Sequence, residues 1–288
     1  MGIDLHAHTT ASDGSLSPRE LVHLAAQVGL SAVAITDHDT TAGWEEGLVA
    51  GISEGVEVVP GVELSTAYEG GRFHLLGYYL RQGTQFLEDL RVVQAARASR
   101  NTELFENLRN LDMPLDEDDV WKFAGENGQL GRPHFARAMV ARGYVTSTQE
   151  AFDLYLADGK PAYATKAVLT PERAIAGIHQ AGGVAIWAHP PRNKKLTPDE
   201  REERLREFVG WGLDGLEVHY SQYDAENVAW ALAMRDRYQL LGTGGSDFHG
   251  ASKPTIQLGV TESGGPLPDE VLDQLQARRD QIQREQNA

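Results

Sequence analysis

Short apolar segments alternate with longer helical segments along most of this sequence, and this alternation limits the chain to few folds. The apolar segments have the length of buried strands, and some helical segments begin with Ser-Pro or Thr-Pro. Strands that alternate with helices predict a parallel sheet, and about seven such units predict an α/β protein with a distorted, TIM-like β/α barrel. The predicted strands cover residues 3–6, 31–36, 56–62, 74–80, 183–188, 213–218 and 240–243.

One long stretch, residues 85–164, lacks the strand pattern. Its apolar residues recur at the spacing of one helix face, as in Leu104 and Leu108. We therefore predict a barrel domain formed by residues 1–84 and 165–288, interrupted by a helical insert domain at 85–164. Such an insert is expected to fold over one end of the barrel.

Net charge and cysteine content narrow the partners that this chain can have. The formal net charge of −16 leaves no excess of Lys and Arg for binding long duplex nucleic acid. A small phosphorylated substrate, a nucleotide or a short oligoribonucleotide, fits better, because bound cations would make one cleft locally positive. No apolar run approaches the roughly 20 residues that span a bilayer, so no membrane contact is predicted, and no feature identifies a protein partner. The absence of cysteine excludes disulfides and thiolate metal ligands and favours a cytoplasmic location.

Metal-binding side chains lie at or near the ends of most predicted strands. His6 and His8 end the first strand, and the two-residue alternation of a strand directs both imidazoles to one side, where they can bind one ion. In a β/α barrel the carboxyl ends of the strands meet at one face, so ligands that are remote in sequence can converge there. Packing alone does not explain several such clusters. The candidate ligands are His6, His8, Asp13, His38, Glu63, His74, His189, Asp247 and His249.

Five motifs resemble those of the PHP family, named for polymerase and histidinol phosphatase. They are Asp-Leu-His-Ala-His-Thr-Thr-Ala-Ser-Asp-Gly, Ile-Thr-Asp-His-Asp, Gly-Val-Glu, Ala-His-Pro and Gly-Ser-Asp-Phe-His, and they span residues 4–249. The resemblance implies a distorted β/α barrel with a two- or three-metal site. The chain is most similar to PHP members that remove the 3′-phosphate from 3′,5′-nucleoside bisphosphates, some of which also degrade short RNA from the 5′ end. Those members share a helical insert, a Gly-Arg-Pro-His motif, here at 131–134, and a Gly-Lys-Pro-Ala-Tyr motif, here at 159–163.

The same resemblance implies an arrangement of ligands around two or three divalent ions. The first ion would be held by His6, His8, Glu63 and Asp247, a second by Glu63, His74 and His189, and a third by Asp13, His38 and His249. Glu63 would bridge the first two ions. Mixed nitrogen and oxygen ligands favour manganese, with iron or zinc as alternatives, over magnesium.

The expected chemistry is hydrolysis of a phosphoester. Closely spaced cations lower the pKa of a bridging water, which gives a hydroxide nucleophile at neutral pH, and they offset charge on the phosphoryl group. Glu63 and Asp247 would take part in catalysis by holding the ions. As hypotheses, Arg132 binds a substrate phosphate, His134 binds phosphate or protonates the leaving oxygen, and Lys160 adds charge near the 5′-phosphate. The plainer interpretations are a surface residue at a helix start for Arg132 and an exposed loop for Lys160.

Three further residues lie at strand ends without a ligand assignment. We interpret Asp37 as a hydrogen-bond partner of a ligand histidine, because carboxylates often orient metal-binding imidazoles in this way. Glu217 and His219 end a predicted strand, so they are expected to face the site or its rim.

Three other functions compete with a nucleotide phosphoesterase. An amidohydrolase acting on C–N bonds also begins with paired histidines on a strand, but it typically uses a carboxylated lysine where Gly-Val-Glu stands here. A metal-binding PHP module without catalysis would be expected to lose ligands, and none is lost. Histidinol phosphatase is an alternative within the PHP family, which the long helical stretch disfavours by analogy.

Overall fold

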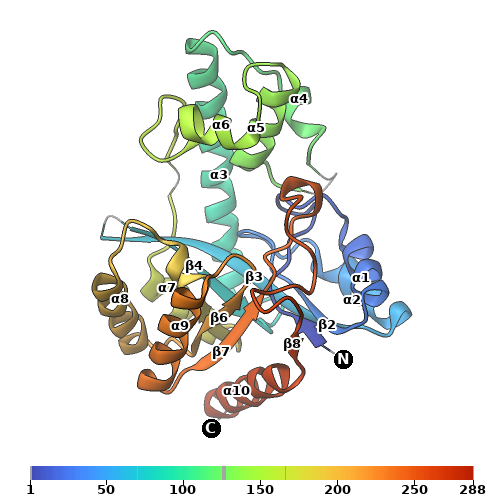
Figure 1. Cartoon of the computed structure of the whole chain (residues 1–288), viewed down its shortest axis with the longest axis vertical. Helices are drawn as coiled ribbons and strands as arrows, with labels where there is room; N and C mark the ends of the chain where they lie inside the picture. Colours follow the sequence, from blue (N-terminus) through green and yellow to red (C-terminus); the bar gives the residue numbers. More distant parts are fainter. Residues whose placement is uncertain (1, 70, 125–127, 166, 288) are drawn as a thin grey trace.

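The structure is a computed structural model of the chain, and it describes residues 2–69, 71–124, 128–165 and 167–287. An 8-stranded sheet curls into a nearly closed barrel with helices around it (Figure 1). This arrangement confirms the predicted α/β barrel, with eight strands instead of about seven.

The strands and helices alternate along the chain as predicted. The strands are β1 (Gly2–Asp4), β2 (Leu30–Ile35), β3 (Glu57–Tyr68), β4 (Gly71–Tyr78), β5 (Val184–Trp187), β6 (Gly215–Tyr220), β7 (Leu241–Gly245) and β8 (Leu267–Pro268). The helices around the barrel are α1 (Pro18–Gln27), α2 (Trp44–Glu54), α7 (Pro171–Gln180), α8 (Pro198–Gly210), α9 (Ala225–Tyr238) and α10 (Glu270–Gln286). Between β4 and α7 come α3 (Gln85–Asn110), α4 (Glu117–Trp121), α5 (Arg132–Ala141), α6 (Thr148–Ala151) and a π-helical turn, η1 (Phe152–Leu156). Two 3₁₀ turns, η2 (Pro190–Arg192) and η3 (Gly250–Ser252), follow β5 and β7.

The sheet is mixed, whereas the sequence predicted a parallel one. The strand order is β7-β6-β5-β4-β3-β2-β1-β8, in which β4 runs antiparallel to β3 and β5, and β8 antiparallel to β1. β3 is longer than expected and returns directly as β4, so this pair is a hairpin without a crossover helix. β8 has only 2 residues, too few to produce a strand pattern in the sequence.

The barrel closes between the segments that follow β1 and β7. Ala7 and Phe248 form a parallel bridge there, and the His8 N–H donates to the Phe248 carbonyl at 2.9 Å. The buried Asp4 carboxylate accepts a hydrogen bond from the Ser246 N–H at 2.9 Å. Backbone pairing therefore fixes the two ends of the barrel sequence against each other.

Serine or threonine followed by proline begins α1, α7 and α8. Ser17 Oγ accepts a hydrogen bond from the Glu20 N–H at 3.2 Å, and the Glu20 carboxylate accepts one from the Ser17 N–H at 2.8 Å. Thr170 and Thr197 cap α7 and α8 with equivalent bonds to their first turns. Caps of this kind stabilise a helix by about 1 kcal/mol each. Because the capping residue and the following proline form a recognisable pair, the starts of α1 and α7 were predictable from the sequence.

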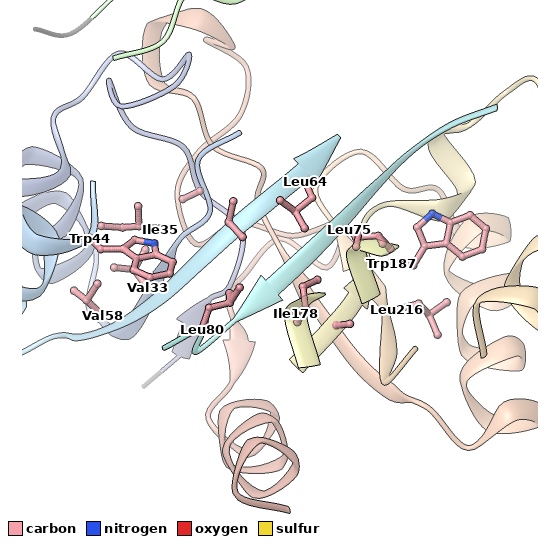
Figure 2. Close-up of a cluster of buried hydrophobic side chains, with 14 of the residues drawn as sticks. Val33, Ile35, Trp44, Val58, Leu64, Leu75, Leu80, Ile178, Trp187 and Leu216 are labelled. Carbon is pink, nitrogen blue, oxygen red and sulfur yellow. The ribbon is translucent and has the colours of Figure 1, made fainter. Parts of the chain in front are cut away.

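Apolar side chains pack on both faces of the sheet. Along β2, Val33 and Ile35 join the cluster between the sheet and the helices, part of which Figure 2 shows. Ala32 and Ala34 point the other way and join the cluster inside the barrel. Burial on both faces explains why the strands read as continuous apolar runs. At the end of the barrel away from α4 to α6, α10 covers the inner cluster (Figure 1).

The long helix α3 connects the barrel with the helices above it in Figure 1. Its 26 residues give a length of about 39 Å. The first turns bury Phe86 and Leu90 in the outer cluster of the barrel, and the last turns bury Leu104 and Leu108 in a separate cluster with α4 and α5. Because α3 belongs to both cores, the division into a barrel domain and an insert domain at 85–164 stays a prediction. No described helix is both long and apolar enough to cross a bilayer.

Candidate metal centre

The predicted metal ligands meet at one end of the barrel. His6, His8 and Asp13 follow β1, His38 follows β2, Glu63 lies in β3, His189 follows β5, and Asp247 and His249 follow β7. His74 reaches the same end for a different reason. It pairs with Ser65 of β3, and the beginning of the antiparallel β4 lies where the parallel strands end. His74 therefore lies inside β4, which begins at Gly71, and does not open the strand as the sequence suggested.

The buried Glu63 carboxylate lies at the centre of these side chains. Its Oε2 is 3.2 Å from His8 Nε2 and 3.1 Å from His38 Nδ1. Its Oε1 is 2.7 Å from His74 Nδ1 and 2.9 Å from His189 Nε2. Burial raises the pKa of Glu63, but nearby histidine charges outweigh it and hold the pKa well below its usual range. Oε1 of this ionised carboxylate thus faces two histidines, and Oε2 faces His8, His38 and, at 3.4 Å, His6 Nε2. A bridging role for Glu63 stays a prediction.

The candidate ligand atoms form three overlapping groups, in each of which they lie within 4.8 Å of one another. The groups are His6, His8, Glu63 and Asp247; His8, Asp13, His38 and His249; and His38, Glu63 and His74. The first group is the set that the family resemblance implies. The other two differ from the expectation, because His8 joins the group of Asp13, His38 joins that of His74, and His189, which we expected with Glu63 and His74, belongs to none of the three groups. The assignment of ligands to individual ions stays a prediction.

The chemistry of this donor set fits divalent metal ions. His38 Nδ1 is buried and lies 3.1 Å from Glu63 Oε2, but among the described residues it has no partner with the geometry of a hydrogen bond. His6 Nε2 lies 3.2 Å from His8 Nε2. Burial lowers the pKa of His38 to about 3, so its imidazole is in the neutral form that binds metal. Burial raises the pKa of Asp13, but His38 and His249 outweigh it and hold that pKa well below its usual range. Burial lowers the pKa of His8, but the carboxylates of Asp247 and Glu63 outweigh it and raise that pKa to about 9, so a metal ion would displace a proton from this ring. Nitrogen and oxygen donors therefore converge, without sulfur.

Glu217 of β6 orients two of the candidate ligands. Its Oε1 lies 2.9 Å from His6 Nδ1, and its Oε2 accepts a hydrogen bond from the His189 backbone N–H at 2.7 Å. The Glu217 side chain is fully buried. A carboxylate on the second nitrogen of a metal-binding imidazole fixes the ring and raises its basicity. The sequence indicated only that Glu217 faces the site, since its place at a strand end was the one available signal.

Asp37 and His219 have other partners than ligand histidines. Asp37 accepts hydrogen bonds from the Thr9 N–H at 2.8 Å and the Ser12 hydroxyl at 2.6 Å. It forms none with a histidine among the described residues, so our interpretation of Asp37 is wrong and its role is to hold the loop after β1. His219 Nδ1 lies 2.6 Å from the Glu262 carboxylate, and His219 belongs to none of the three ligand groups.

Three non-glycine residues at this end of the barrel have left-handed backbone conformations. Asp39 has a φ of 54°, His189 of 34° and Asp247 of 57°. Such conformations cost about 1–3 kcal/mol each, and they gather at functional sites where the surrounding structure fixes them. Two of the three, His189 and Asp247, are candidate metal ligands. Their unfavourable backbone conformations are therefore maintained at positions whose side chains point to the cluster.

A cavity of about 160 Å³, which we call the arginine cavity, adjoins the cluster at Asp13, His38 and His74. Four arginines line it: Arg72 of β4, Arg97 and Arg100 of α3, and Arg132 of α5. Arg97 and Arg100 are three positions apart and therefore share one face of α3. The cavity thus lies between the barrel and the helices above it.

The arginines of the arginine cavity are poorly neutralised. Burial and the charges of Arg97, Arg132 and Arg72 lower the pKa of Arg100 to about 9. Among the described residues, Arg97 forms an ion pair with Asp39, whereas Arg72, Arg100 and Arg132 form none. Guanidinium groups that repel one another in this way are suited to an anion, and their planar forks match phosphate oxygens.

The predicted substrate-binding residues differ in their places. Arg132 lines the arginine cavity, its guanidinium lies 5.5 Å from the ring centre of Tyr163, and it donates to the Leu156 carbonyl at 3.1 Å. Lys160 is exposed in a turn and does not line the cavity. Arg72, Arg97 and Arg100 line the cavity instead, although no sequence motif pointed to them, and a substrate contact by Lys160 stays a prediction.

His134 is buried beneath the start of α5. Its Nδ1 accepts a hydrogen bond from the Gly131 N–H at 3.0 Å, and its Nε2 has no partner among the described residues. Burial lowers the pKa of His134 to about 4. A neutral, enclosed imidazole is a poor proton donor at neutral pH, so the structure favours a positioning role over protonation of a leaving oxygen.

Comparison with known proteins identifies the family. The PHP domain model matches residues 4–113. A 5′-3′ exoribonuclease from Haemophilus influenzae is 36% identical over 247 residues, which cover 85% of this chain and 89% of that protein. This chain belongs to the PHP family. A 3′,5′-nucleoside bisphosphate phosphatase from Chromobacterium violaceum is 30% identical over 96% of this chain and 97% of its own length. The solved structure of a proposed metal-dependent phosphoesterase from Bifidobacterium adolescentis is 35% identical, covers 96% of both chains and has a TM-score of 0.87.

Membership of the PHP family confirms the predicted enzyme class. The chain is a metal-dependent phosphoesterase, that is, a hydrolase of phosphoester bonds. Its clustered His, Asp and Glu side chains are suited to binding divalent ions at the end of the PHP barrel.

Proposed function

We propose that this PHP enzyme removes the 3′-phosphate from 3′,5′-nucleoside bisphosphates and also releases nucleotides from the 5′ end of short RNA. The observation that carries the proposal is the arginine cavity, which adjoins the metal-ligand cluster at Asp13, His38 and His74. A substrate with two phosphates would place one at the cluster, where it is cleaved, and the other among the arginines. The activities named for the relatives from H. influenzae and C. violaceum support the same two substrates.

The second phosphate is the feature that the arginines would recognise. The chain has a net charge of −16, so four guanidinium groups around one cavity are not a consequence of its composition. A hydrogen bond to a charged group contributes about 1.5–3 kcal/mol, so two of them would favour a bisphosphate over a monophosphate by about a hundredfold or more. A substrate with one phosphate leaves this charge uncompensated.

Two or three divalent ions are part of the proposal, with manganese first and iron or zinc as alternatives. When bound, they would supply an activated water at neutral pH and offset charge on the phosphoryl oxygens. Glu63 and Asp247 would hold them together with the histidines of the three groups, and Glu217 would keep the His6 ring in one orientation. Arg100 and the other arginines would fix the second phosphate, so that the ester oxygen is presented to the cluster.

Histidinol phosphate is the alternative substrate within the PHP family. It carries one phosphate and an ammonium group, and the ammonium group would be repelled by the arginines of the cavity. A nucleoside bisphosphate supplies a second anion in its place. The cytoplasmic location that the absence of cysteine favours belongs to the same proposal.

The proposal is tested by incubating the manganese-loaded chain separately with adenosine 3′,5′-bisphosphate and with histidinol phosphate. We expect adenosine 5′-phosphate and inorganic phosphate from the first substrate, and little turnover of the second. Release of adenosine 3′-phosphate, or a preference for histidinol phosphate, would refute the substrate assignment.

A further inference from the structure

A second cavity, of about 260 Å³, reaches the metal-ligand cluster from another side. Both cavities are lined by Asp13, Pro133 and Phe152, which therefore separate them. The arginine cavity contacts the cluster through His38 and His74, whereas the second cavity contacts it through His249. A third cavity contacts the cluster at His74 and His189 and shares Arg72 and His74 with the arginine cavity, so it lies on that side of the cluster. The second cavity is the one that reaches the cluster at His249.

Arg137 of α5 supplies a cation to the second cavity. Its guanidinium lies 4.6 Å from the ring centre of Phe123, and its Nη1 is 3.4 Å from Ser252 Oγ. Among the described residues it forms no ion pair, although it is half-buried, and burial lowers its pKa. By contrast Arg142, at the end of the same helix, is exposed and pairs with Asp119. A half-buried, unpaired guanidinium beside an open cavity is suited to a phosphate group.

Lys253 links the second cavity to the cluster. It lines the cavity, and its Nζ donates to Asp247 Oδ2 at 2.6 Å. Thr148 and Gln149 of α6 are exposed and line the same cavity. The cavity therefore offers positive charge near the cluster and polar groups toward solvent, which suits one nucleotide of a chain that continues outward.

The proposed reaction shows why a second opening matters. In a bisphosphate, the oxygen of water bonds to the 3′-phosphorus, the P–O3′ bond breaks, and O3′ leaves with one of the water protons. The products are a nucleoside 5′-phosphate and inorganic phosphate. In RNA with a 5′-phosphate the same bond breaks, but the phosphorus also carries the O5′ of the next nucleotide, which leaves as a shortened 5′-phosphorylated chain. A phosphodiester therefore needs room for a substituent that a phosphomonoester lacks.

We propose that the second cavity binds the nucleotide on the 3′ side of the cleaved bond, and that it enables the chain to act on short RNA. This inference rests on the proposed function, in which the 5′-phosphate of the first nucleotide occupies the arginine cavity. With that cavity filled, the next nucleotide has to leave the cluster on another side, and the opening at Asp13 and His249 lies there.

The test compares adenosine 3′,5′-bisphosphate with the 5′-phosphorylated dinucleotide pApA, using the manganese-loaded full chain. Arg137→Met removes one charge-assisted contact, so we expect kcat/KM for pApA to fall about tenfold, with the bisphosphate value changed less than about twofold. Arg137→Lys should retain most of the pApA activity. Arg142→Met is the matched control, since Arg142 is exposed and lies outside the cavity, and it should change neither substrate.

A second variant guards against misfolding at the half-buried Arg137. Gln149→Trp places a bulky ring at an exposed position on the cavity wall, and we expect it to slow pApA cleavage selectively. Equal losses on both substrates, or no loss on either, would overturn the inference. A wild-type chain that cleaves the bisphosphate but not pApA would overturn it while leaving the phosphatase proposal intact. A chain that cleaves neither would contradict the proposed function and this inference together.

Discussion

The two walls of the active-site cleft differ in origin and in charge. The barrel wall carries histidines and carboxylates on backbone that is fixed by strand pairing, as for Glu63 of β3 and His74 of β4. The helical wall carries three of the four arginines of the arginine cavity, of which Arg97 and Arg100 lie on α3, which leaves the barrel (Figure 1), whereas Arg72 lies on β4. Ligands of metal ions need to be held within fractions of an ångström, and sheet hydrogen bonds provide that rigidity. If the proposed function holds, catalysis depends mainly on the barrel wall and substrate choice mainly on the helical wall, so substitutions should alter the two separately.

The largest effect is expected at the centre of the barrel wall. Glu63→Gln keeps the shape of the side chain but removes the charge shared by five histidine contacts. Removing one partner from a buried charge network costs about 3–5 kcal/mol, so kcat/KM should fall about a thousandfold on every phosphoester, with loss of bound metal. Glu57→Gln, at the exposed start of the same strand, is the control. If the Glu63→Gln chain keeps its metal and cleaves an aryl phosphate like the wild type, the proposed catalytic role of the barrel wall is wrong.

A smaller effect on the same wall is expected at Glu217. Glu217→Gln weakens the contact with His6 Nδ1, and loss of such a contact typically lowers metal affinity by about 10–100-fold. Titration of the metal-free chain with manganese measures the change. Glu226→Gln, exposed at the start of α9, should bind metal like the wild type. Unchanged affinity in Glu217→Gln would show that this carboxylate does not orient the ligand.

On the helical wall we expect a selective effect. Arg132→Ala should raise KM for adenosine 3′,5′-bisphosphate about tenfold or more, because one guanidinium contact with the second phosphate is lost. KM for a simple aryl phosphate, which lacks that phosphate, should change little. Arg109→Ala, exposed near the end of α3, serves as the control. Equal effects on both substrates would remove the distinction between the two walls.

The last expected effect concerns stability at the start of α5 and leaves activity at neutral pH aside. The pKa of His134 in the folded chain is about 4, below the unfolded value near 6.5, so between these values the unfolded chain binds more protons. The contribution of His134 is therefore complete above about pH 6.5 and lost as the pH falls toward 4, by at most about 3 kcal/mol. Urea unfolding of His134→Gln and the wild type at pH 7.5 and pH 5 measures it. The variant should lose less stability on acidification, and parallel losses would contradict a buried neutral imidazole.

The barrel wall was more predictable from sequence than the helical wall, for physical reasons. His6 and His8 are visible because strand alternation places both imidazoles on one side, and strand ends converge in any β/α barrel. The antiparallel course of β4 was not visible, since the sequence shows the length of a strand and not its direction. Arg72 was missed for this reason, because β4 carries it to the cluster end of the barrel.

The arginines of α3 were missed because charge at helical spacing is the ordinary pattern of a solvated helix face. Only the packing of α3 against the barrel distinguishes Arg97 and Arg100 from Arg109, which is exposed on the same helix. Arg132 was found through a motif, whereas Lys160, chosen in the same way, lies outside the cavity. Sequence motifs thus located side chains that meet at the strand ends of the barrel, but they did not separate cavity-lining from exposed cations on helices and loops.

The most direct test of the two-wall account is the ratio of kcat/KM for adenosine 3′,5′-bisphosphate to kcat/KM for adenosine 3′-phosphate, measured with the manganese-loaded chain. Both substrates present the same ester to the metal-ligand cluster, and only the first has a second phosphate for the arginine cavity. The account predicts a ratio of about a hundred or more, which falls strongly in Arg132→Ala. A ratio near one in the wild type would contradict it.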